Sequence, residues 1–131
     1  MTIEEKIEGF PNLWADYVNQ GELQKLLGLY NDTATLLPTF SPRSVNTEEK
    51  LIEYFEKLSS RDGLNVSLHD NTVHPQKIGA QSYVISGIYS FKFEVDGTLL
   101  TFPSRFTFVV DLSLEKPILH HHSSQIPRNL S

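Results

Sequence analysis

The stretch that decides the fold is QSYVISGIYSFKFEVDGTLLTFPSRFTFVVD, residues 81–111. Aromatic and β-branched residues, which favour strands, fill most of it. The Asp96-Gly97 pair near its middle is typical of a tight hairpin turn. We therefore expect two long antiparallel strands, residues 81–95 and 98–111, joined directly at this turn.

Apolar residues occupy both faces of these two expected strands. Side chains on a strand alternate between faces, so Phe106, Phe108 and Val110 share one face, while Arg105 and Val109 share the other. A sheet covered by helices on one side should be polar on its other side. We expect the outer face to pack against a second copy of the chain. The alternative is one well-filled core with scattered exposed aromatic residues.

The residues that precede the strands read as helices. Apolar side chains recur at spacings of three and four in residues 10–18, 23–30 and 51–58, which predicts three amphipathic helices. Thr2 and Glu5 have the spacing of a capping box. Pro11 either kinks the first helix or marks its first turn.

The order of the expected elements defines the fold class. A short strand, residues 34–37, separates the second and third helices, and a last strand, residues 117–124, follows the hairpin. Helices followed by a meander of antiparallel strands predict an α+β domain with its helices on one face of the sheet. The length of 131 residues fits a single domain, 1–131.

Composition excludes several classes of function. The net charge is −5 and no Lys/Arg cluster occurs in the sequence, so we expect no nucleic-acid partner. The absence of cysteine excludes disulfides, thiolate metal sites and Cys nucleophiles. No apolar run reaches the ~20 residues of a membrane span, and the first residues do not resemble a signal peptide. We expect a cytoplasmic protein with no membrane partner.

The segment Ile118-Leu119-His120-His121-His122-Ser123-Ser124 holds the most distinctive side chains. Regular alternation places His120 and His122 on one strand face together with Ile118 and Ser124, and His121 on the other face. Imidazole side chains can donate and accept protons, so a pair of them is suited to binding an anion or relaying a proton. We therefore predict that His120 and His122 form the floor of a pocket.

Two alternatives stay open for this histidine pair. His120 and His122 could be neutral buried imidazoles, hydrogen-bonded to a neighbour such as Tyr89. They could also chelate a metal, but the third ligand would have to be His69, His74 or a carboxylate that the sequence does not place. We predict no metal and no other cofactor.

Four further residues complete the expected pocket. Arg105 lies between aromatic residues in the middle of its strand, and a buried arginine needs an anionic partner. We expect it to bind a carboxylate or phosphate in the pocket; the alternatives are a pairing with an internal Glu or Asp, or a place at the rim of the sheet. Tyr89 and Trp14 would supply amphipathic walls, unless they are ordinary core residues. Arg43, in a proline-rich loop, either covers the mouth of the pocket or is a solvated loop residue.

Several segments together resemble a known superfamily over nearly the whole chain. The strongest are RFTFV (105–109) and the final HHHSSQIP (120–127). The others are the Trp14 helix with the Gly21 stop and the Leu-rich second helix, YNDTATLLPT (30–39), residues 48–55 and GIYSF (87–91). The chain resembles the nuclear transport factor 2-like superfamily. Within it, the chain is most similar to SnoaL-like proteins and to the calcium/calmodulin-dependent protein kinase II association domain.

The resemblance implies a cone, also described as a cystatin-like roll, in which a curved antiparallel sheet wraps around three N-terminal helices. It implies a deep pocket at the open end, faced by Arg105, His120 and His122, and self-association through the outer sheet face. In SnoaL-like relatives the same pocket holds small molecules, in some cases with isomerase, cyclase or hydrolase chemistry.

The sequence departs from the catalytic pattern of isomerase-type relatives. The position of their acidic base falls at Leu37 or Pro38, neither of which can take a proton. Whether the chain is an enzyme is therefore open, and His122 is the best candidate for a catalytic base. We predict a self-associating domain that binds a small polar or anionic molecule. The alternatives are a SnoaL-like enzyme and a purely structural oligomerisation module.

Overall fold

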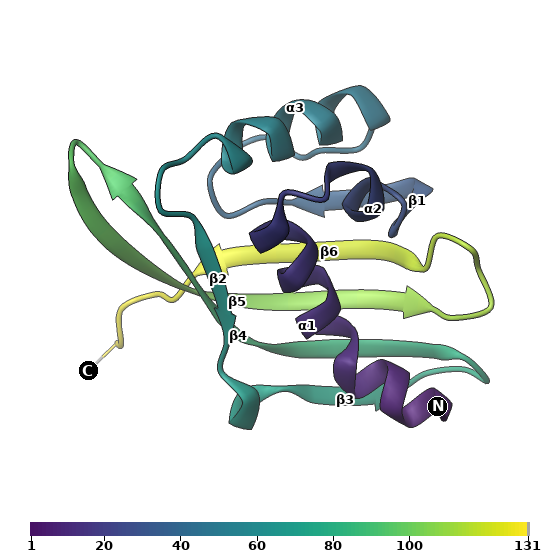
Figure 1. Cartoon of the computed structure of the whole chain (residues 1–131). Coiled ribbons are helices and arrows are strands. Elements are labelled where there is room, and N and C mark those ends of the chain that lie inside the picture. The colour runs from purple at the N-terminus through teal and green to yellow at the C-terminus, as the bar shows by residue number, and fades with distance from the viewer. Residues whose placement is uncertain (131) are drawn as a thin grey trace.

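The computed structural model describes residues 1–130 as a curved sheet with its helices beside it (Figure 1). In chain order the elements are α1 (Ile3–Gln20), α2 (Leu23–Leu27), β1 (Tyr30–Leu37), α3 (Glu48–Ser59), β2 (Asn65–Leu68), the 3-10 turn η1 (Asp70–Thr72), β3 (His74–Lys77), β4 (Ser82–Val95), β5 (Thr98–Asp111) and β6 (Ile118–Gln125). No helix among these residues combines the length and apolar character of a membrane span.

The sheet has six strands in the order β1-β6-β5-β4-β2, with β3 also paired to β4. The two longest strands, β4 and β5, form an antiparallel hairpin in the middle of the sheet. Asp96 and Gly97 form its turn, with φ angles of 50° and 80°. All pairs are antiparallel except β1 with β6, which are parallel. The expected hairpin and the α+β fold class are confirmed.

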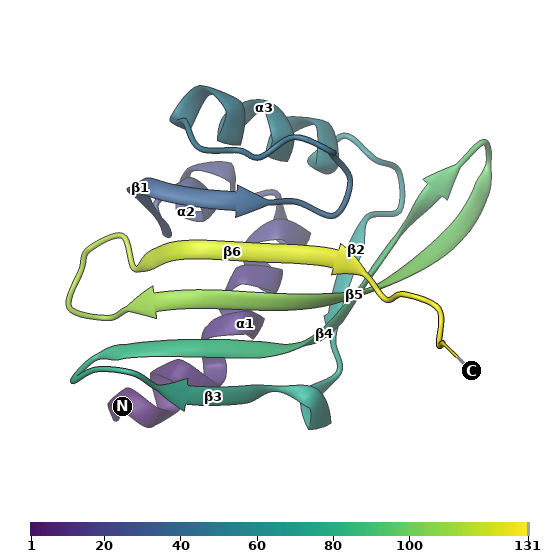
Figure 2. The same ribbon diagram turned by 180° about the vertical axis from the view of Figure 1, so that it is seen from behind.

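The helices leave one face of the sheet bare. Helix α1 crosses one face, and α2 and α3 lie toward the β1 edge (Figure 1). Seen from behind, no helix passes in front of β6, β5 and β4 (Figure 2). We call this bare side the outer face. Side chains on it, such as Val84 and Val109, are only half-buried, whereas their neighbours on the covered face are buried.

Capping residues define where helix α1 begins and ends. The Thr2 hydroxyl accepts a hydrogen bond from the Glu5 amide at 3.1 Å, and the Glu5 carboxylate accepts one from the Thr2 amide at 3.3 Å. This reciprocal pair is the capping box that the sequence predicts. The helix ends at Gly21, whose φ of 66° suits a residue without a side chain. Pro11 lies inside α1, so it does not open the helix.

Strand β1 begins earlier than the sequence indicates. Tyr30 has the spacing of the second helix, but it is the first residue of β1, and α2 ends at Leu27. The reason is tertiary: β1 pairs in parallel with β6, Tyr30 opposite Ile118 and Leu36 opposite His121. Local helical periodicity cannot compete with a strand partner supplied from the other end of the chain.

Trp14 occupies the centre of the core and is 1% exposed. Its ring stacks on Tyr89 with a centroid separation of 5.3 Å and meets the rings of Phe55 and Phe108 edge-on. Each such contact adds to the burial of a large apolar surface. The space between α1 and the sheet is thus filled by aromatic side chains.

Gly87 offers a first test of this packing. An added Cβ would lie 2.8 Å from the Phe106 ring, which is 2% exposed and stacked on Tyr89 at 4.6 Å. Because the ring cannot turn aside, we expect Gly87→Ala to lower the free energy of unfolding by about 2 kcal/mol, measured by urea denaturation. Gly9→Ala is the control: open space surrounds Gly9 in α1, and this change should stabilise. Equal stability of Gly87→Ala and the wild type would contradict the packing.

Candidate functional site

A β-bulge at the start of β6 decides which histidine faces the core. Strand β5 pairs Val109 with His120 but Val110 with Ile118, so Leu119 is an extra residue in the ladder. The extra residue shifts the alternation of side chains by one position. Ile118 and His121 are therefore both buried, and His122 is exposed. The expectation that His120 and His122 share a face with Ile118 is wrong for this reason.

His121 is the centre of a buried hydrogen-bond network. The Trp14 indole N–H donates to the Tyr30 hydroxyl at 3.0 Å, and that hydroxyl lies 2.8 Å from Nδ1 of His121. On the other side of the ring, Nε2 lies 3.1 Å from the Tyr89 hydroxyl, which donates to Ser123 at 2.6 Å. No buried side-chain polar atom among residues 1–130 lacks a partner.

The network has one direction of donation. The Tyr30 oxygen accepts from Trp14, so its single O–H is free to donate to Nδ1 of His121. A neutral imidazole that accepts at Nδ1 carries its proton on Nε2 and donates to Tyr89. Burial, with smaller contributions from the adjacent His120 and His122, lowers the pKa of His121 to about 3. His121 is therefore a neutral structural residue.

The interior of the cone has almost no free volume. The space between Trp14, Tyr89 and His121 is only about 10 Å³, at most enough for one water molecule. Aromatic rings thus occupy the interior where the resemblance implies a deep pocket. The hydrogen bond between Thr39 and Ser123 lies beside this space.

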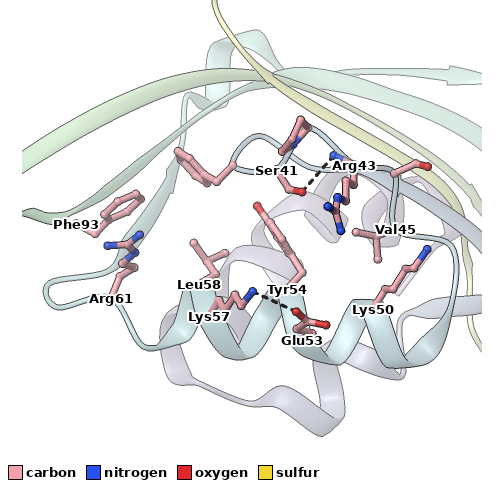
Figure 3. Close-up of a pocket in the computed structure, with 13 residues that line it drawn as sticks. Ser41, Arg43, Val45, Lys50, Glu53, Tyr54, Lys57, Leu58, Arg61 and Phe93 are labelled. Carbon is pink, nitrogen blue, oxygen red and sulfur yellow. Dashed lines mark hydrogen bonds and ion pairs between the residues drawn. The ribbon is translucent and has the colours of Figure 1, made fainter.

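A larger cavity of about 360 Å³ lies at the mouth of the cone, between α3 and the loop of residues 40–45. We call it the mouth cavity (Figure 3). Its charged side chains are Arg43, Lys50, Glu53, Lys57 and Arg61, and its walls are Phe40, Val45, Tyr54, Leu58 and Phe93. Burial raises the pKa of Tyr54, so its hydroxyl stays protonated.

The remaining predicted site residues lie on the outer face. Arg105 is opposite Ser124, and Thr107 is opposite His122. Together they line an open hollow of about 460 Å³ with residues of β4 and η1. Arg105 and His122 are exposed and His120 is half-buried.

The structure therefore divides the six predicted residues among three places. Trp14 and Tyr89 are in the core, Arg43 lines the mouth cavity, and Arg105, His120 and His122 lie on the outer face. The six residues therefore do not form one site.

The sequence reasoning missed Lys50, Lys57 and Arg61. Their spacing of seven and then four residues is the signal that places them along one side of α3 and its C-terminal turn.

His69 and His74, the two histidines that could have supplied a third metal ligand, do not lie beside His120 and His122. Nε2 of His69 is 2.8 Å from the Ser90 hydroxyl, and His74 pairs with Ser86 at the β3 edge. Within residues 1–130, no three histidine or carboxylate side chains are arranged to hold a metal ion.

Three solved structures show the fold class. A putative calcium/calmodulin dependent protein kinase II association domain from Xanthomonas campestris has a TM-score of 0.83 and 25% identity, covering 95% of this chain and 88% of that one. An ntf2-like protein with a cystatin-like fold from Novosphingobium aromaticivorans has a TM-score of 0.76 and 10% identity, covering 97% and 84%. A ketosteroid isomerase-like protein from Erwinia carotovora atroseptica has a TM-score of 0.76 and 12% identity, covering 93% and 95%.

These similarities place the chain in the nuclear transport factor 2-like fold class, as the resemblance implied. The family assignment is more specific. The chain belongs to the calcium/calmodulin dependent protein kinase II association domain family, whose model matches residues 4–127. No curated protein matches the sequence.

Proposed function

We propose that the chain is a self-association module that pairs with further copies through the outer face of its sheet. The observation that carries this proposal is the bare outer face of β4, β5 and β6 (Figure 2). Membership of an association-domain family supports a second copy as the occupant of that face. Catalysis receives less support, because the interior contains a filled aromatic core rather than a substrate-sized cavity.

The side chains of the outer face suit a protein interface. Leu37, Val84, Ile88 and Val109 are half-buried on it, and a second copy would remove their remaining apolar surface from water. Arg105 lies among them, and arginine is enriched in interfaces. Within residues 1–130, no carboxylate lies within 4.0 Å of its guanidinium, so it is available to a partner.

The two predicted pocket histidines also belong to this surface. His120 is opposite Val109, and His122 is opposite Thr107. Capture of a small anion by Arg105, His120 and His122 stays a prediction. Here it would take place at the open outer hollow rather than inside the cone.

The oligomeric state tests the proposal. Sedimentation equilibrium should give a mass that is a multiple of the 14.9 kDa chain. Val109→Lys would bury an unpaired charge in the interface, so we expect association to weaken about a hundredfold or more, without loss of the circular dichroism spectrum. Leu13→Lys is the matched control, because Leu13 is 39% exposed on α1. A wild-type monomer, or unchanged association of Val109→Lys, would overturn the proposal.

A further inference from the structure

We propose that two copies of the chain hold a doubly charged tetrahedral oxyanion, sulfate or inorganic phosphate, between their outer faces. Each copy contributes its outer hollow, the concavity of about 460 Å³ that Arg105 and His122 line on the bare side of the sheet (Figure 2). This inference rests on the proposed function, because the anion site is complete only when a second copy covers the face. It makes self-association dependent on the anion.

The outer hollow contains a cation without a counter-charge. Arg105 lines it together with His122, and no carboxylate is among its lining residues. By strand alternation, Asp111 lies on the same side of β5. Its carboxylate already accepts hydrogen bonds from the hydroxyls of Ser82 and Ser113, at 3.1 and 2.6 Å. Neither ion pair within residues 1–130 includes Arg105.

The other polar groups of the hollow are suited to an oxyanion. Arg105 lies opposite Ser124, and Thr107 lies opposite both His122 and Ser86. These five side chains line the same hollow. Guanidinium, imidazole and hydroxyl groups can all donate hydrogen bonds, and the arginine fork matches two oxygens of one phosphate-type group. The hollow therefore supplies donors of the kind that bind a sulfate or phosphate.

The position of Arg105 brings it close to its counterpart in a pair of copies. Strand β5 lies between β6 and β4, so Arg105 is in the middle strand of the bare strip. When two identical faces pair about a twofold axis, residues near the axis meet their equivalents. Two guanidinium groups would then be removed from water side by side. A buried charge without a counter-charge is strongly destabilising, so the two faces need an anion in order to pair.

A tetrahedral dianion fits such a pair in charge and in symmetry. Its two negative charges balance the two guanidinium groups. A tetrahedron also has a twofold axis, so an anion on the axis of the dimer presents one pair of oxygens to each copy. Each pair can accept both hydrogen bonds of one arginine fork. A carboxylate has one charge and two oxygens, so it would satisfy only one of the two Arg105 side chains.

Sedimentation equilibrium of the 131-residue chain tests the dependence on the anion. The measurement would compare about 5 mM sulfate with chloride and with acetate at equal ionic strength. An anion that binds only the associated form, with a dissociation constant of about 0.5 mM, strengthens association about tenfold at that concentration. We expect this gain with sulfate and none with acetate. Equilibrium dialysis with radiolabelled sulfate should give one anion for every two chains.

Variants separate this proposal from the proposed function. Arg105→Gln should associate equally in sulfate and in chloride and should bind no sulfate. Lys6→Gln, at an exposed position of α1, removes a cation elsewhere and should keep the wild-type response. A wild-type monomer in every buffer would overturn both proposals. Equal association of the wild type in sulfate and chloride, one sulfate bound per chain, or a sulfate response that survives in Arg105→Gln would overturn the anion site alone.

Discussion

Acidification below pH 6.5 should cost the folded protein about 1.4 kcal/mol per pH unit through His121 alone. The folded-state pKa of His121 is lowered to about 3 by burial, whereas an unfolded histidine titrates near its ordinary value of about 6.5. Between these two values the unfolded chain binds a proton that the folded chain does not. Stability therefore falls as the pH falls through this window, and the loss approaches roughly 5 kcal/mol at its lower end.

The network explains why His121 resists protonation. A second ring proton, on Nδ1, would point at the Tyr30 oxygen, whose own O–H would then need another acceptor. That oxygen already accepts from Trp14 at 3.0 Å, and the Tyr89 side of the ring is occupied at 3.1 Å. A buried cation without a nearby carboxylate would also lose its hydration.

Urea denaturation at several pH values between about 5 and 6.5, where most carboxylates remain ionised, would measure this effect. The wild type should lose about 1.5 kcal/mol across that range. His121→Gln keeps an acceptor and a donor but cannot titrate, so its stability should be lower at pH 7 and nearly constant across the range. His122→Gln, at the exposed neighbouring position, should retain the wild-type slope. A slope that survives in His121→Gln would show that another group is responsible.

The parts of the fold that depend on local signals could be predicted from the sequence. The Asp96-Gly97 turn and the strand alternation around it define the β4–β5 hairpin, and Thr2 with Glu5 defines the start of α1. These features follow from backbone geometry within a few residues. They required no knowledge of the remainder of the chain.

The site depends on features that local signals do not encode. The bulge at Leu119 is defined by the pairing of β6 with β5, a strand that precedes it in the chain. In a run of three histidines, a shift of one residue exchanges the core residue with its neighbours. The volume left inside the cone likewise depends on how the rings of four different elements pack. The helical spacing of Lys50 and Lys57 in α3 can be recognised in the sequence. The loop that carries Arg43 lies beside them only because of the tertiary structure.

Replacing Trp14 by alanine should be the most damaging single change in the core. The side chain is 1% exposed, and loss of a buried tryptophan costs about 4 kcal/mol. The change also removes the donor to the Tyr30 hydroxyl. We expect Trp14→Ala to remain folded only at low denaturant, with a transition well below that of the wild type.

The Trp14→Ala variant should also bind a small aromatic molecule in the space that the indole leaves. The space vacated by the indole adjoins the small void beside His121, and Tyr54 and Leu58 line both that void and the mouth cavity. Trp14→Ala would therefore leave a cavity in the filled interior, separated from the mouth cavity by Tyr54 and Leu58. Indole matches the missing side chain and can donate its N–H to Tyr30, so it should bind there and raise the unfolding midpoint as its concentration rises.

Thermal denaturation with increasing indole would show this rescue, and Trp14→Phe provides the control. Phenylalanine keeps most of the aromatic volume and loses the N–H donor, so we expect a loss of about 2 kcal/mol and no response to indole. If indole leaves the midpoint of Trp14→Ala unchanged, the core has collapsed around the deletion. The space vacated by the indole would then be closed to a ligand, because the neighbouring side chains have moved into it.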